Sequence, residues 1–211
     1  MHEREDRCDG GPPVLMGFSA KLPIRNPQGF THPFDDVLSV SDCNRQTPIE
    51  GFREFDEWYE TGFVKSEQAL IRAIQLEKEW GLDQTRSLEY KTIHGVSPPG
   101  PYTLLAYRIC PIWFNSRGVQ TGLHHAVHPP LLAHPPDLST YERAGYDLAN
   151  IAHGAVGCSP LFCNSLANEI TVNRYCLLDT LDQAMEVGQH FGAEQPEPGD
   201  YVLFEVWHKA H

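Results

Sequence analysis

The 211-residue sequence contains no run of lysine or arginine, no long apolar segment and comparatively little positive charge. It has 16 Lys and Arg against 28 Asp and Glu, which gives a formal net charge of −12. Such a surface repels phosphate, so no nucleic-acid partner is expected, and a basic protein or a cationic ligand is favoured instead. The longest apolar stretch, residues 102–114, is shorter than the ~20 residues of a membrane-spanning helix, so no membrane association is expected.

Several catalytic signatures are missing as well. The sequence has no G-x-S-x-G nucleophile elbow, no Walker-type glycine loop and no G-x-G-x-x-G after a predicted strand. Residues 1–13 are polar and lack the apolar core of a signal peptide or an anchor, so we expect a flexible N-terminal tail and a cytoplasmic protein. Six cysteines without a secretory signal indicate reduced thiols rather than a disulfide framework.

The remaining composition is that of an ordinary globular protein, with 41% hydrophobic and 21% charged residues. We predict a single α+β domain over residues 14–211 with a mixed sheet. Apolar patterning predicts strands at residues 14–24, 37–40, 88–93, 102–109 and 146–152, and helices at residues 51–60 and 67–80. Residues 115–136, rich in proline and histidine near their end, are predicted to be irregular.

The C-terminal third predicts a strand at residues 174–178, a helix capped by Asp179 or Thr180, and a strand at residues 201–207. The short connections favour a right-handed β-α-β crossover onto one sheet. In the earlier helix, Ser66 is the expected N-cap and Gly81 the expected C-terminal residue, while Glu77 is expected at the helix edge, in contact with water.

Cys158 is the candidate nucleophile. Ser159 followed by Pro160 is typical of a helix start, and a thiol just before a helix has a lowered pKa, which favours the reactive thiolate. His153 or His190 is the candidate base. The alternative interpretation is that Cys158 is a small buried hydrophobic residue, which is the usual position of a free cysteine.

A second hypothesis is a zinc site formed by His153, Cys158, Cys163 and Cys176, because three thiolates with one imidazole is a known tetrahedral zinc composition. Their spacing is H-x4-C-x4-C-x12-C. Cys176 weakens the hypothesis, because it lies within the predicted strand at residues 174–178, where its side chain would face the core.

Two further groups merit attention. His124 and His128 would share one face of a helix, but Pro129 opposes that helix, so solvated histidines in a surface loop are expected. Trp113 and Phe114 precede a polar loop that contains Arg117, and these three residues are the candidate ligand-binding rim at a sheet end.

Three functional hypotheses therefore stand. The charge of −12 and the missing catalytic motifs favour an acidic interaction protein that masks a basic partner, as inhibitor and immunity proteins do. The alternative is a small cysteine-dependent enzyme that uses Cys158. The third hypothesis is a zinc-binding protein with histidine and cysteine ligands.

Overall fold

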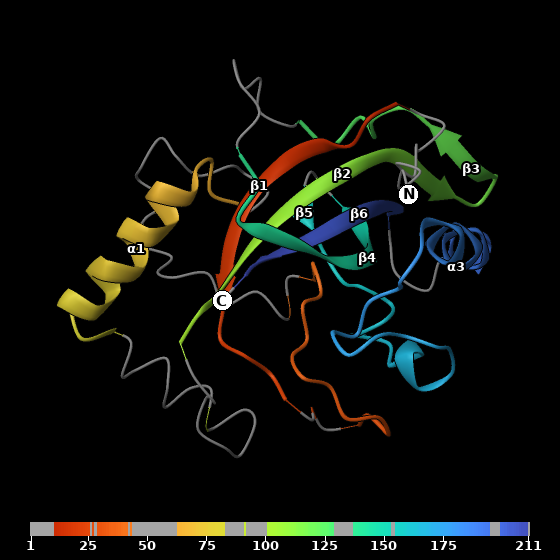
Figure 1. The fold of residues 1–211 in the computed structure, drawn as a ribbon. Coiled ribbons are helices and arrows are strands. Elements are labelled where there is room, and N and C mark those ends of the chain that lie inside the picture. Colours follow the sequence, from red (N-terminus) through yellow and green to blue (C-terminus); the bar gives the residue numbers. More distant parts are fainter. Residues whose placement is uncertain are drawn as a thin grey trace, which may run out of the picture.

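Six strands form one sheet in the computed structural model of the chain (Figure 1). The structure describes residues 11–25, 27, 29–41, 43, 63–82, 91, 101–128, 137–152, 155–194 and 199–210. The strands are β1 (Val14–Lys21), β2 (Thr103–Asn115), β3 (Gly118–Thr121), β4 (Tyr141–Ala152), β5 (Ala155–Val156) and β6 (Asp200–Lys209). Their order is β1-β2-β6-β4-β5, and β3 pairs with β2 outside that path. The α+β class is thus confirmed.

Every strand pairing among the described residues is antiparallel, so the predicted mixed sheet is wrong there. The predicted strand at residues 174–178 contributes a single bridge, from Leu178 to Tyr146 of β4. Its extended conformation is interrupted because Cys176 takes a left-handed φ of 60°. In addition, the side-chain oxygen of Asn173 accepts hydrogen bonds from the backbone N–H groups of Tyr175 and Leu177, which holds a turn.

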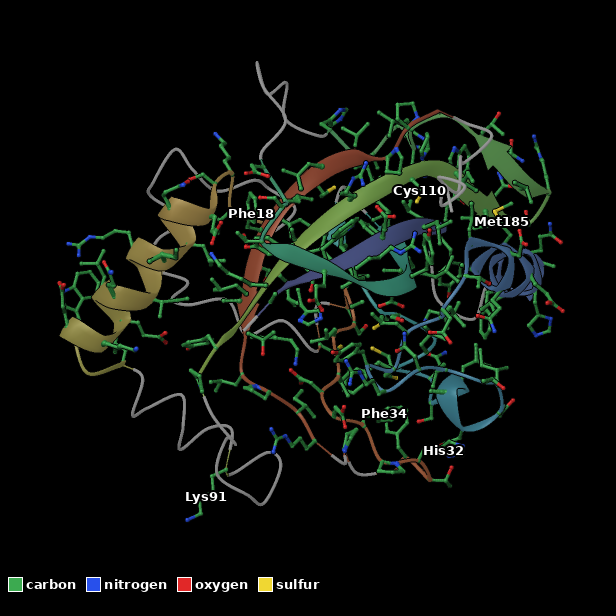
Figure 2. All side chains as sticks on the ribbon, in the orientation of Figure 1. Phe18, His32, Phe34, Lys91, Cys110 and Met185 are labelled. Carbon is green, nitrogen blue, oxygen red and sulfur yellow. The ribbon has the colours of Figure 1, made fainter. Side chains whose placement is uncertain are left out.

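Helix α3 (Leu181–Glu194) and strand β6 follow that bridge, as the sequence predicts. Thr180 caps the helix: its hydroxyl accepts from the backbone N–H of Gln183, and the Gln183 side chain accepts from the backbone N–H of Thr180. Ala184 and Phe191 are buried against the sheet, and Leu181 and Met185 pack on the same cluster (Figure 2). The predicted apolar face of this helix is confirmed.

Helix α1 (Glu67–Glu79) begins at the predicted residue and ends one residue before the predicted end at Trp80. Ser66 accepts from the backbone N–H of Ala69, and Gly81 takes a left-handed φ of 71°. Leu70 packs with Phe18 of β1, which lies on the side of the sheet nearest α1 (Figures 1 and 2). Glu77 differs from the expectation, because it is fully buried and accepts a 2.6 Å hydrogen bond from the Tyr102 hydroxyl.

The sheet is buried on both faces. Along β6, Tyr201 and Leu203 belong to one core cluster, and Val202 and Phe204 belong to another. This alternation follows from the two-residue period of a strand, and it explains why these strands are almost wholly apolar. β2 lies between β1 and β6 and runs through Pro111, where the pairing with β6 is irregular.

Two further segments differ from the prediction, and several others lie outside the described residues. Residues 37–40 are buried but form no strand, because their backbone N–H groups bond to Ile24, Tyr175 and Asp147 rather than to one neighbouring strand. Residues 118–121, expected to be irregular, form β3 in a hairpin with β2. The predicted helix at residues 51–60 lies outside the described residues, as do residues 129–136, residues 1–10 of the tail and all but Lys91 of the predicted strand at 88–93.

Candidate metal centre

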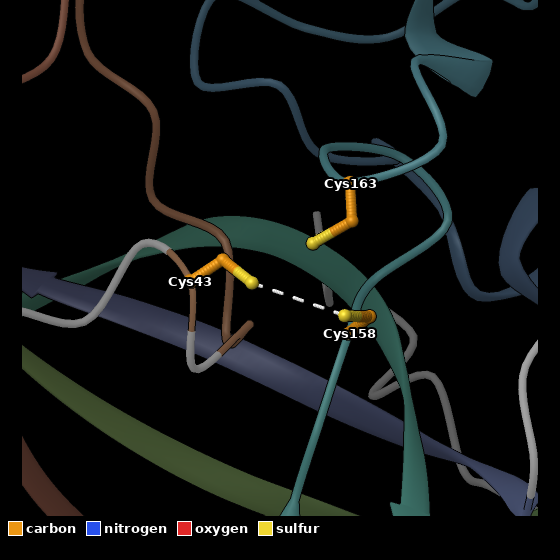
Figure 3. A group of neighbouring side chains, drawn as sticks. All are labelled: Cys43, Cys158 and Cys163. Atoms are coloured by element: carbon orange, nitrogen blue, oxygen red, sulfur yellow. Dashed lines mark hydrogen bonds between the residues drawn. The ribbon is translucent and has the colours of Figure 1, made fainter. Parts of the chain in front are cut away.

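Three cysteine thiols converge at one point of the described structure. The sulfur atoms of Cys43, Cys158 and Cys163 all lie within 4.8 Å of one another, and those of Cys43 and Cys158 are 3.8 Å apart (Figure 3). Cys43 approaches from one chain segment, whereas Cys158 and Cys163 come from a loop more than a hundred residues later (Figure 3). Cys43 is exposed and the other two are half-buried. This cluster is able to hold a metal ion.

The two cysteine-bearing segments are held together by Asp147 of β4. Its carboxylate is fully buried and accepts hydrogen bonds from the hydroxyls of Ser39, at 2.7 Å, and Ser159, at 2.6 Å. It also accepts from the backbone N–H groups of Val40 and Leu148, each at 2.8 Å. Ser39 and Val40 lie just before Cys43, and Ser159 follows Cys158. One buried carboxylate therefore fixes both segments.

Ser41 connects the anchored segment to the thiols. Its hydroxyl lies 3.0 Å from the sulfur of Cys163 and accepts a hydrogen bond from the backbone N–H of Cys43. Its own backbone N–H bonds to the Ser39 hydroxyl. A hydroxyl beside a sulfur can donate to a thiolate and so stabilise the form that binds metal.

The later segment has a second attachment to β4. The backbone N–H of Asn150 donates to the Cys158 carbonyl, and the backbone N–H of Gly157 donates to the Asn150 carbonyl. A Cβ atom at Gly157 would come within 2.5 Å of the Asn150 side-chain oxygen, so glycine permits this close approach. Cys158 is thus positioned by backbone hydrogen bonds as well as by Asp147.

Burial dominates the electrostatics of the cluster. It raises the pKa of Cys163 to about 12; the Ser41 hydroxyl opposes this shift, and the neighbouring thiols add to it. Burial also raises the pKa of Asp147, against its four hydrogen-bond donors. The metal-free cluster therefore holds Cys163 as a thiol, which a bound cation would have to deprotonate.

The structure brings together two of the four predicted zinc ligands, Cys158 and Cys163, and adds Cys43 in place of Cys176. Cys176 is fully buried in an apolar cluster, and burial raises its pKa. His153 lies outside the described residues. Sequence reasoning missed Cys43 because it is 115 positions away from Cys158 and no local spacing connects them.

The helix predicted to begin at Pro160 does not form; residues 160–164 are a turn. The Ser159 hydroxyl donates to Asp147 instead of capping a helix, so no helix dipole acts on Cys158. The other candidate base, His190, is exposed on α3 and lines a cavity of about 410 Å³ with Leu166, Ile170 and Phe191. The proposed nucleophilic role of Cys158 stays a prediction.

The aromatic residues of the candidate ligand-binding rim, Trp113 and Phe114, lie on opposite faces of the sheet. Phe114 is fully buried beneath α3, where a Cβ atom at Gly188 would come 2.3 Å from its ring. Trp113 points the opposite way, because neighbouring strand residues alternate, and its ring packs edge-on against His124. Arg117 is exposed at the β2–β3 turn. The two aromatic rings therefore do not share one surface, and ligand binding at Trp113, Phe114 and Arg117 stays a prediction.

His124 is not the solvated loop residue that we expected. It is buried, its Nε2 lies 3.0 Å from an Asp200 carboxylate oxygen, and its Nδ1 accepts from the backbone N–H of Ala126. This pattern requires the proton on Nε2, so both ring nitrogens are already engaged and the residue has no free ligand atom. His125 and His128 are exposed, as expected.

No protein-family model, curated protein or solved structure matches this chain. In the part of the chain that the structure describes, none of the helices has the length and apolar character needed to cross a membrane.

Proposed function

We propose that this protein binds one Zn²⁺ ion through the thiolates of Cys43, Cys158 and Cys163. The observation that supports the proposal is the spacing of the sulfurs. Tetrahedral zinc with Zn–S bonds of about 2.3 Å places two sulfurs about 3.8 Å apart. Cys43 and Cys158 have this separation, and Cys163 lies within 4.8 Å of both.

The donor set favours a soft or borderline metal. Thiolates select zinc, Cu(I) and iron–sulfur clusters, whereas Mg²⁺ and Ca²⁺ prefer oxygen ligands. Among the described residues the cluster supplies three ligand side chains, so a tetrahedral ion keeps one position for water or an outside ligand. The surrounding hydrogen bonds hold the two segments near the required positions, which lowers the ordering cost of binding.

The acidic interaction hypothesis rests on the net charge of −12 and on the missing catalytic motifs, and neither of these identifies particular residues. That charge suits a cationic ligand, which includes a metal ion, as well as a basic protein. The zinc proposal is preferred because it adds a specific group of residues to the same charge argument.

The test is zinc binding by protein purified without a histidine tag. We expect one zinc per chain by elemental analysis, and we expect each of C43S, C158S and C163S to weaken binding in a competition titration by at least tenfold. Cys110 provides the matched control: it is a buried thiol in the apolar core, so C110A should keep full zinc affinity if it remains folded. Wild-type protein without stoichiometric zinc, or three cluster variants that bind like wild type, would contradict the proposal.

A further inference from the structure

We propose that Cys43 and Cys158 are an oxidation site, at which a hydroperoxide forms a disulfide that removes two zinc ligands and releases the metal. The metal-release part of this proposal rests on the proposed zinc site, whereas the disulfide does not. The two sulfurs are already in contact, 3.8 Å apart, and must approach to about 2.05 Å to bond. Side-chain rotation of the exposed Cys43 is the simplest way to make that approach.

The exposures of the three thiols set the order of events. Cys43 is exposed and meets a solvent oxidant first, whereas Cys158 and Cys163 are half-buried. Cys163 is also in contact with the Ser41 hydroxyl, 3.0 Å from its sulfur. Figure 3 shows the Cys43 sulfur directed at that of Cys158. Cys43 is therefore the residue oxidised first, and Cys158 is the thiol that resolves it.

The disulfide between Cys43 and Cys158 forms in two steps. The Cys43 thiol takes one oxygen from the hydroperoxide, which gives a sulfenic acid and leaves an alcohol, or water when the oxidant is hydrogen peroxide. The Cys158 sulfur then attacks the Cys43 sulfur, the S–O bond breaks, and the departing hydroxide takes the Cys158 proton to form water. Two thiols are oxidised by two electrons, and one peroxide O–O bond is reduced.

The disulfide leaves too few ligands in the cluster to hold zinc. A disulfide sulfur is no longer a thiolate and does not hold zinc, so only Cys163 of the cluster remains as a ligand. A single thiolate does not retain zinc, and the ion leaves. In the zinc-loaded protein the metal occupies the same sulfurs, so zinc should slow the oxidation.

The test treats full-length protein with a small excess of hydrogen peroxide, with and without zinc, and maps disulfides by mass spectrometry of the digested chain. In the metal-free protein we expect free thiols to fall by two from the six of the chain, with Cys43 and Cys158 joined. C163S should form the same disulfide. C158S should not, and its Cys43 should become labelled by dimedone, a sulfenic-acid reagent. C110A should behave like wild type.

Two readouts separate this proposal from the zinc site. If the protein binds no zinc but metal-free Cys43 and Cys158 still join, the zinc proposal fails and the oxidation site stands. If the protein binds zinc but peroxide gives no Cys43–Cys158 disulfide in the metal-free protein, or joins Cys158 to Cys163 there, the oxidation site is overturned while the zinc proposal stands. In zinc-loaded protein we expect one zinc released for each disulfide formed; a disulfide without zinc release would overturn the release part.

Discussion

Two buried aspartates hold the segment at residues 34–41 against the sheet, and they do so with different partners. Asp36 accepts a 2.6 Å hydrogen bond from the Lys21 ammonium, together with bonds from the backbone N–H groups of Ile24 and Val37 and from the Thr103 hydroxyl. Asp147 accepts only from neutral donors, two hydroxyls and two backbone N–H groups. One carboxylate is balanced by a cation, and the other is not.

The surroundings of the two carboxylates differ as well. The Asp36 contacts lead to β1 and β2, which are structural parts of the sheet. The Asp147 contacts lead to Ser39 and Ser159, which lie beside the thiol cluster. Asp36 and Asp147, the two anchoring aspartates, should both stabilise the fold, but only Asp147 should also determine the positions of the metal ligands.

Substituting Asp147 should have the largest effect on both the stability of the fold and the affinity for zinc. D147N keeps the size of the side chain but replaces one acceptor oxygen with a donor amide. Two of the four donors then lack an acceptor in a buried site, and we expect a loss of about 4 kcal/mol in the free energy of unfolding. Urea denaturation measures this loss. Zinc affinity of the folded variant should fall by about 10–100-fold, because the residues that position metal ligands have effects of that size.

Substituting Lys21 should lower the free energy of unfolding somewhat less than D147N does. K21M leaves Asp36 buried without its cation, but three neutral donors remain, so Asp36 comes to resemble Asp147. We expect the free energy of unfolding to fall by about 3 kcal/mol, which is at the lower end of the effect of breaking a buried ion pair. Zinc affinity should not change. A K21M protein that loses zinc binding while it remains folded would erase the distinction between the two anchors.

The smallest effect is a pH dependence. Burial lowers the pKa of Lys21, and the Asp36 carboxylate opposes that shift. As pH falls from about 10.4, the unfolded lysine therefore takes up a proton before the folded one does, so Lys21 contributes stability at high pH that is lost as pH falls toward its folded pKa.

The matched measurement is the difference in unfolding free energy between wild type and K21M at several pH values. This difference should rise with pH as the pH approaches the unfolded lysine pKa of about 10.4, with a slope of at most about 1.4 kcal/mol per pH unit. Other titrating groups cancel in the difference. A flat difference up to that pH would mean that the folded and unfolded pKa of Lys21 are equal.

The sequence predicts the periodic parts of this fold well, because hydrophobic periodicity is a local property. Strands β1, β2, β4 and β6 and helices α1 and α3 all lie where the apolar pattern predicts them, with shifted ends. The thiol cluster depends instead on where residues 37–41 and Cys43 lie relative to β4. No spacing in the chain encodes that arrangement, so the local pattern predicts Cys176 as a ligand and does not predict Cys43.

One signal in the sequence did point to the anchor. Asp147 and Asn150 interrupt the apolar strand at residues 146–152, and a carboxylate inside a fully covered strand must find hydrogen-bond donors. Its donors turn out to be the serines next to the cysteines. Polar residues within predicted core strands are therefore the place to look for such sites.

X-ray absorption spectroscopy at the zinc edge of the zinc-loaded protein tests the three-cysteine zinc site most directly. We expect a shell of three sulfurs at about 2.3 Å from the metal, which should lose one sulfur in C43S. A shell made only of nitrogen and oxygen atoms, or a sulfur shell that C43S leaves unchanged, would contradict it.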